Sequence, residues 1–293
     1  MLNFRPFSWQ DKDTYTSFFQ ASPVHYAEYS FFGLWAWLHA YPLEIAYDEN
    51  LCWLISGGPL PGIFGPAGNW DAVTDWDKAL AHFKSGDIIH DVPAKVRDIL
   101  AGRENLRFTI DRDQAEYVYS VKDLISLKGK AYAHKRNRVR AFLDGYEWDY
   151  EELRPEIFGE ILEFQDSWRI HREDTMTPEE AVSLDDEDKA IRNALDKWND
   201  FRFAGGLLRV DGRIIAYTIA EELDPENLDI RFEKAFGEYA GSYQAINYMF
   251  LKNHGSGYKF ANREEDMGEP GLREAKLSYN PTIMLEKYQM EIL

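Results

Sequence analysis

The β-rich segment 229–236 alternates apolar and charged residues, and Arg231 and Glu233 are two of its four charged side chains. Residues two apart in an extended strand lie on the same face, so Arg231 and Glu233 are expected side by side. If that face lines a cleft, Glu233 can act as a general base and Arg231 can hold an anion. The alternative is an ion pair on an edge strand, because charged side chains are common on half-exposed strands. Tyr279 is a candidate general acid, with a buried core tyrosine as the alternative.

A second charged group follows the short strand predicted over 259–262. A loop connects this strand to a predicted helix over 271–278, and such loops carry the binding sites of many α/β folds. Arg273 and Lys276 share a helix face and, with Arg263, can hold a phosphate or a carboxylate. The alternative is a structural salt-bridge network that closes the fold. The candidate binding residues here are Asn262, Arg263, Glu264, Asp266, Arg273 and Lys276.

The segment 127–143 is basic and contains no acidic residue. Lysine and arginine neutralise phosphates in a salt-sensitive way, so this segment is a candidate contact for a phosphate or a tRNA acceptor stem. The alternative is a solvated helix face that pairs with acidic surface elsewhere. The candidate residues are Lys128, Lys130, Lys135, Arg136 and Arg140.

The net charge is strongly negative and unevenly distributed. The chain of 293 residues has 33 basic and 51 acidic side chains, which gives −18. Residues 1–144 have 16 basic and 18 acidic residues (−2), whereas residues 145–293 have 17 and 33 (−16). This balance argues against a general nucleic-acid coat protein and a polybasic membrane-surface binder. Any phosphate partner is therefore expected at 128–140 and the junction of the two halves.

Cysteine and histidine usage excludes several other chemistries. Cys52 is the single cysteine, so neither a disulfide framework nor a multi-cysteine zinc site is possible within the chain. The seven histidines are scattered without a metal-binding spacing, and no metal site is expected. The first residues lack a signal sequence, and the best apolar stretch, 29–43, is too short to span a bilayer. We expect a soluble, cytoplasmic protein in which this stretch forms a buried helix.

The second half of the chain has the clearer order of elements. Helices are predicted over 155–172 and 188–201, followed by strands over 204–210 and 213–221. Asp211-Gly212 between these strands favours a tight hairpin, since both turn residues need positive φ. A strand over 229–236, a helix over 242–253, and the strand and helix described above follow, with a last strand over 283–292.

The first half has a similar order. Strands are predicted over 2–7, 43–47, 51–56, 62–65, 87–90 and 106–110, and helices over 11–21, 30–40, 71–84 and 93–100. The two similar orders predict a duplicated α/β (α+β) fold with mixed central sheets flanked by helices. The expected domains are 1–126 and 145–293, joined by a basic connecting helix over 127–144.

Three stretches of the chain carry a resemblance to a known family. They are Lys128–Val139 (KGKAYAHKRNRV), Asn262–Pro281 (NREEDMGEPGLREAKLSYNP) and Tyr29–Phe32 ahead of Leu34 and Trp35. Through these stretches the chain resembles the family built around the C-terminal domain of phosphatidylglycerol lysyltransferase. The resemblance implies a tandem acyl-CoA N-acyltransferase fold, also called GNAT-like.

The resemblance implies transfer of an aminoacyl group from aminoacyl-tRNA to an amine or hydroxyl acceptor at a cleft between the domains. The acceptor would be a small molecule or a lipid headgroup, and no tightly bound cofactor is expected. An acyl-CoA-dependent N-acyltransferase is the first alternative, and a non-catalytic protein that binds an anionic ligand is the second. The turn Gly237–Ser242 departs from the acyl-CoA pyrophosphate pattern, and Glu238 adds a negative charge to it.

Overall fold

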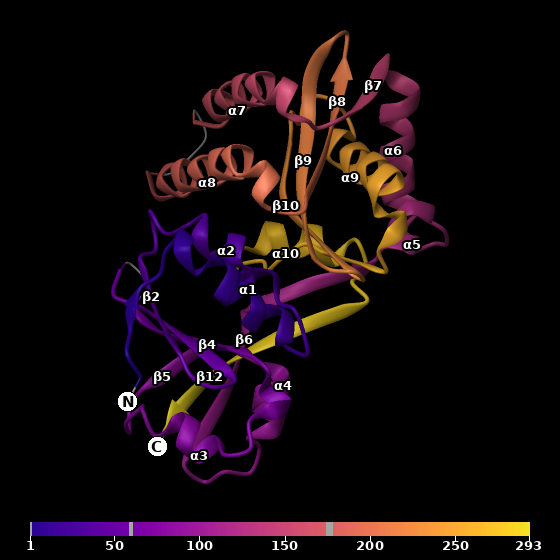
Figure 1. Ribbon diagram of the computed structural model, residues 1–293. Coiled ribbons are helices and arrows are strands. Elements are labelled where there is room, and N and C mark those ends of the chain that lie inside the picture. The colour runs from indigo at the N-terminus through magenta and orange to yellow at the C-terminus, as the bar shows by residue number, and fades with distance from the viewer. Residues whose placement is uncertain (1, 59–60, 174–177) are drawn as a thin grey trace. The chain divides into compact units, whose positions relative to one another are not determined.

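The computed structural model describes residues 2–58, 61–173 and 178–293, and it divides into two compact units (Figure 1). Unit 1 comprises Met1–Glu116, Glu265–Arg273 and Met284–Leu293. Unit 2 comprises Tyr117–Glu264 and Glu274–Ile283. These bounds differ from the expected ranges because the chain returns to unit 1 at its end, where the last strand enters the unit 1 sheet.

The sheet of unit 1 has the strand order β1-β2-β3-β4-β5-β12-β6. Neighbours β4 and β5 are parallel, whereas β1–β2, β2–β3, β3–β4 and β5–β12 are antiparallel. Its strands are β1 (Arg5–Pro6), β2 (Leu43–Tyr47), β3 (Leu51–Ser56), β4 (Gly62–Gly68), β5 (Ile88–Pro93), β12 (Ile283–Ile292) and the first part of β6 (Leu106–Ser120).

Short helices accompany this sheet: α1 (Lys12–Ala21), α2 (Phe31–Trp35), α3 (Trp76–Leu80) and α4 (Ala94–Ile99). The Ser30 side chain accepts a hydrogen bond of 2.9 Å from the Gly33 amide and so begins α2. The predicted helices over 30–40 and 71–84 are too long, since α2 ends at Trp35 and turns follow it. An apolar run alone does not distinguish a helix from a buried turn.

The sheet of unit 2 has the order β6-β11-β10-β9-β8-β7. Its strands, besides the end of β6, are β7 (Trp148–Glu152), β8 (Phe203–Val210), β9 (Arg213–Asp224), β10 (Asn227–Ala235) and β11 (Phe260–Asn262). Strands β10 and β11 are parallel, whereas β7–β8, β8–β9 and β9–β10 are antiparallel pairs. The predicted hairpin at 211–212 is confirmed, with φ of 50° at Asp211 and 78° at Gly212.

Helices cover both faces of this sheet (Figure 1). On one face, α6 (Ala133–Gly145) and α9 (Ser242–His254) pack Phe142 and Ile246 against β8 and β9. On the other face lie α7 (Phe158–Glu173) and α8 (Pro178–Asp196), and the Phe164 and Tyr217 rings are 5.4 Å apart. Two further helices are α5 (Val121–Ser126) and α10 (Pro270–Leu277).

Two sequence expectations need correction here. The basic helix does not cover 127–144, because Leu127 ends α5 with φ of 46° and Gly129 has φ of 87°. Strand β6 continues to Ser120, well beyond the predicted end at 110. Across the residues that the structure describes, no helix is both long and apolar enough to cross a bilayer.

Candidate functional site

Glu233 and Arg263 meet just beyond the stretch over which the parallel strands β10 and β11 pair. Arg263 directly follows β11, and its Nη2 is 2.8 Å from Oε1 of Glu233 on β10. Asn247 of α9 donates a hydrogen bond of 2.9 Å to the other oxygen, Oε2. The two charged side chains are 15% and 9% exposed, so this ion pair is largely removed from water. Both oxygens of Glu233 are bound, and the carboxylate holds the Arg263 guanidinium in position.

The Tyr279 ring lies against two cations. The Arg263 Cζ is 4.8 Å and the Lys135 Nζ is 3.7 Å from the ring centroid. The Tyr279 hydroxyl also hydrogen-bonds with the side chains of Arg263 and Gln244. Burial raises the pKa of Tyr279 to about 12, although Arg263 opposes the shift. At neutral pH the hydroxyl therefore keeps its proton and can donate it in a hydrogen bond.

Lys135 reaches this ring from α6 and is 6% exposed. Burial lowers its pKa to about 8; the nearby positive charge of Arg263 lowers it as well, while Glu233 opposes both effects. A substantial fraction of the amine is therefore neutral at mildly alkaline pH, and a neutral amine can accept a proton.

The turn after β11 is fixed by its own polar groups. Lys276 donates a hydrogen bond of 2.6 Å to the Arg263 carbonyl. The buried Asn262 accepts one of 2.9 Å from the Glu264 amide, and Glu264 has φ of 57°. Asn262, Arg263, Lys276, Glu233, Tyr279 and Lys135 are thus brought together in unit 2.

Arg231 does not join this group. It is the extra residue at a register shift between Ile230 and Phe232, so the alternation that placed it beside Glu233 is interrupted. Its nitrogens lie 2.8 Å from the carboxylates of Glu221, Asp229 and Glu264. Burial alone would lower the pKa of Arg231, but these acids raise it. The structure therefore places Arg231 in an internal ion cluster.

Asp266 and Arg273 form a separate network in unit 1. Arg273 Nη2 is 2.7 Å from the buried Asp266 carboxylate and 2.6 Å from that of Asp113. Arg112 contacts Asp266 as well, at 3.2 Å. Arg273 and Lys276 share a helix face as predicted, yet they bind different partners.

The basic segment contains both exposed and internal cations. Lys128, Lys130 and Arg140 are exposed, as the phosphate prediction requires. Arg136 instead donates hydrogen bonds to the carbonyls of Leu127 and Gly129, where it stabilises the turn before α6.

The turn before α9 binds neighbouring protein groups. The Ala240 amide donates to the Tyr146 hydroxyl at 3.0 Å, and the Ser242 amide donates to the Tyr239 carbonyl at 3.0 Å. Gly241 has φ of 85°, and a Cβ at this position would lie 2.3 Å from the Arg138 carbonyl oxygen. Helix α6 therefore packs closely against this turn.

The sequence interpretation missed two sets of residues. Asn247 and Gln244 support the Glu233–Tyr279 group, and a polar residue within the apolar helix 242–253 was the available signal. In unit 1, the fully buried Lys287 pairs with Glu28 and, at 3.2 Å, with Glu116. No local pattern connects these three residues. Among the described residues, no three His, Cys, Asp or Glu side chains are arranged to hold a metal ion.

The sequence of this chain matches a known family and a curated relative. The family model described as "Phosphatidylglycerol lysyltransferase, C-terminal" matches residues 20–291. A curated relative, an uncharacterized protein of Mycoplasmoides gallisepticum, is 25% identical over 186 residues, which are 63% of this chain. The match spans 58% of that relative, less than two thirds of its length.

Three solved structures share the fold. A conserved protein of unknown function from Bacteroides thetaiotaomicron is 30% identical with a TM-score of 0.85, and the match covers 100% of both chains. The C-terminal domain of a putative lysylphosphatidylglycerol synthetase from Agrobacterium fabrum is 14% identical, with a TM-score of 0.64 and coverage of 97% and 92%. A tandem GNAT protein from the clavulanic acid biosynthesis pathway is 10% identical, with a TM-score of 0.50 and coverage of 99% and 98%.

These comparisons confirm the predicted tandem GNAT-like fold. The family model and the shared fold agree, since both relate the chain to C-terminal domains of the lysylphosphatidylglycerol synthetase type. With the match extending over most of its length, the chain belongs to the family of the phosphatidylglycerol lysyltransferase C-terminal domain.

Proposed function

We propose that this protein transfers an aminoacyl group from aminoacyl-tRNA to an amine or hydroxyl acceptor. The observation that supports the proposal most directly is the group formed by Glu233, Arg263, Tyr279 and Lys135, in a chain that belongs to this family. It combines a fixed cation, a protonated hydroxyl and an amine with a depressed pKa. A nucleophilic attack on an activated ester requires groups of these kinds.

In the proposed reaction, the acceptor nitrogen or oxygen attacks the ester carbonyl carbon, and Lys135 in its neutral form takes the acceptor's proton. Arg263 and the Tyr279 hydroxyl stabilise the oxyanion of the tetrahedral intermediate. The new bond to the acceptor remains, and the ester bond to the tRNA ribose breaks. The ribose oxygen leaves with a proton that Lys135 returns. Glu233 is a positioning residue that keeps Arg263 in place.

The exposed cations Lys128, Lys130 and Arg140 are proposed to contact tRNA phosphates. The bound amides of the turn before α9 and the charge of Glu238 favour tRNA over coenzyme A as donor. Three phosphate contacts on a duplex stem would weaken binding about 40-fold between 50 and 200 mM salt.

The binding test measures the affinity of the whole chain for aminoacyl-tRNA at several salt concentrations. A variant with Lys128→Gln, Lys130→Gln and Arg140→Gln should lose about three units of the logarithmic salt slope. A matched control with Lys189→Gln and Lys259→Gln, two exposed lysines outside the segment, should keep the full slope. An unchanged slope in the first variant would contradict tRNA docking at this segment. Binding of coenzyme A without binding of tRNA would select the acyl-CoA alternative.

The activity test measures release of a labelled amino acid from charged tRNA in the presence of phosphatidylglycerol vesicles or a small amine. Arg263→Lys should lower kcat by at least about 100-fold, because the oxyanion loses a fixed planar donor. Lys189→Gln should leave kcat unchanged. Full activity of the Arg263→Lys variant would remove Arg263 from the mechanism.

A further inference from the structure

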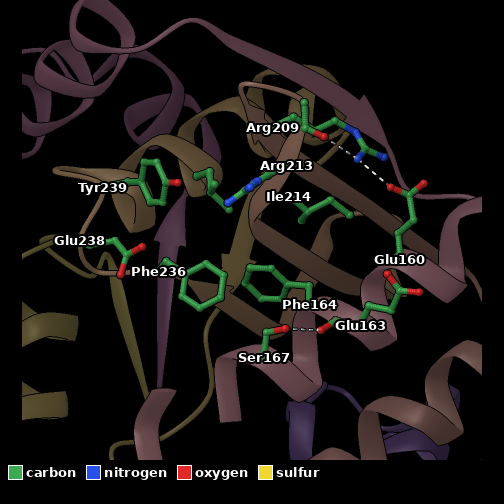
Figure 2. A pocket seen from close by; sticks show the side chains of 12 residues that line it. Glu160, Glu163, Phe164, Ser167, Arg209, Arg213, Ile214, Phe236, Glu238 and Tyr239 are labelled. Atoms are coloured by element: carbon green, nitrogen blue, oxygen red, sulfur yellow. Dashed lines mark hydrogen bonds and ion pairs between the residues drawn. The ribbon is translucent and has the colours of Figure 1, made fainter. Parts of the chain in front are cut away.

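A pocket of about 540 Å³ lies in unit 2, between α7 and the start of β9 (Figure 2). Its third wall is formed by Phe236, at the end of β10, and by the turn that follows. Phe236 packs on the α7 side of the sheet, with its ring 4.8 Å from that of Phe164. Glu233 instead binds Asn247 of α9, on the other side of the sheet. The pocket is therefore separate from the proposed reaction group.

One helix face supplies most of the polar wall. Glu160, Glu163, Phe164 and Ser167 are spaced so that all four face the pocket from α7. Glu160 lies 2.7 Å from Arg209, which also contacts Glu151 at 3.1 Å, so the Arg209 charge is neutralised by the protein. The Ser167 hydroxyl donates a hydrogen bond to the Glu163 carbonyl. Its oxygen can still accept one.

Three charges in the pocket are not neutralised in this way. Within the described part of the chain, neither Arg213 nor the Glu163 carboxylate has an ion-pair partner. Among the described residues, the single ion-pair partner of Glu238 is the exposed His171, at 3.8 Å. Figure 2 shows the Arg213 side chain extending into the pocket toward Tyr239, with the rings of Phe164 and Phe236 between Glu238 and Glu163. One cation and two acids thus surround an aromatic floor.

We propose that this pocket binds a free amino acid with an apolar side chain. Arg213 would bind the carboxylate in a bidentate manner, and Glu163 or Glu238 would bind the ammonium group. The side chain would pack on the half-buried Phe236, whose ring rests on the buried Phe164, because apolar surface of this kind favours an apolar ligand side chain. A pocket of this volume lies within the usual range for small-molecule sites.

The test uses isothermal titration calorimetry with the full chain and L-phenylalanine as the probe. Two analogues each lack one charge: phenethylamine has no carboxylate, and 3-phenylpropionate has no ammonium group. L-phenylalanine should bind at least about 10-fold more tightly than either analogue, because each lost ion pair is a charge-assisted contact. Tighter binding of either analogue would overturn the assignment of a zwitterion. No binding of L-phenylalanine or L-leucine at millimolar concentration would overturn the site itself.

Variants locate the binding. Arg213→Gln should weaken binding of L-phenylalanine at least about 10-fold and leave binding of phenethylamine unchanged. Glu163→Gln should also weaken binding of L-phenylalanine but leave binding of 3-phenylpropionate unchanged, because that analogue has no ammonium group. Both side chains are exposed, so both variants should fold, and their melting temperatures provide the check. Arg154→Gln, at an exposed arginine outside the pocket, is the matched control. If both pocket variants bind L-phenylalanine as tightly as the control, the ligand lies elsewhere and the proposal fails.

Discussion

Replacing Lys135 by methionine removes a buried charge and keeps most of the side chain's length and apolar surface. Burial, assisted by repulsion from Arg263, lowers the pKa of Lys135 from 10.5 to about 8. At about 1.4 kcal/mol for each pKa unit, the protonated amine costs the folded state about 3 kcal/mol at neutral pH. The variant also loses the contact between the Lys135 ammonium and the Tyr279 ring, which stabilises the wild type by about 1 kcal/mol. Lys135→Met should therefore stabilise the protein by about 2 kcal/mol.

The sign of the effect also fixes its pH dependence. The folded pKa lies below the unfolded one, so between about pH 8 and pH 10.5 the unfolded chain binds more protons than the folded chain. Wild-type stability then rises with pH relative to the variant. The advantage of Lys135→Met should be complete below about pH 8 and should disappear as the pH approaches 10.5.

Urea unfolding at pH 7 and at pH 10 measures both effects. Lys128→Met, at an exposed lysine, is the control and should change stability little at either pH. A Lys135→Met variant that is less stable than the wild type at pH 7 would refute the reasoning. In that case the ammonium gains more from Tyr279 and Glu233 than burial costs, and Lys135 would not supply a neutral amine near physiological pH.

Three further predictions concern stability. Gly241→Ala should destabilise the protein strongly, because its Cβ would meet the Arg138 carbonyl oxygen, whereas Gly237→Ala, with nothing within 4 Å, should melt near the wild-type temperature. Burial and the charge of Asp91 raise the pKa of Glu28 to about 7, so its proton stabilises the fold at low pH and stability falls between about pH 4.5 and 7. Glu28→Gln should flatten this fall in chemical denaturation, and an unchanged profile would contradict the shift. Lys287→Met should cost about 3–5 kcal/mol, measured in the same way, since it leaves the buried Glu116 carboxylate without its cation.

Local signals predicted the elements whose residues determine their own conformation. Strands 43–47 and 51–56 were predicted with the bounds that the structure shows, and the hairpin at 211–212 follows from two residues that accept positive φ. The strand predicted over 106–110 stops short of the end of β6, because the next four residues, 111–114, include three charged side chains and are partly or fully exposed. These polar residues obscured the connection to the buried stretch 115–119, which continues the same strand.

The candidate site depended on contacts that no local pattern contains. The period of two placed Arg231 beside Glu233, but a bulge separates them, and a bulge leaves little trace in one sequence. Lys135 was grouped with exposed cations, although its position on α6 turns it toward Tyr279. Lys287, Glu28 and Glu116 come from three distant segments, so only the folded sheet brings them together.

The place of β12 in the sheet constrains how the chain acquires its structure during synthesis. Strand β12 lies between β5 and β6 in unit 1, so the sheet of that unit is incomplete until β12 has emerged from the ribosome. Nearly all of unit 2 precedes β12 in the sequence. Unit 2 can therefore fold before unit 1. Until β12 inserts, the facing edges of β5 and β6 in unit 1 remain unpaired, and a chaperone or a second nascent chain can bind them.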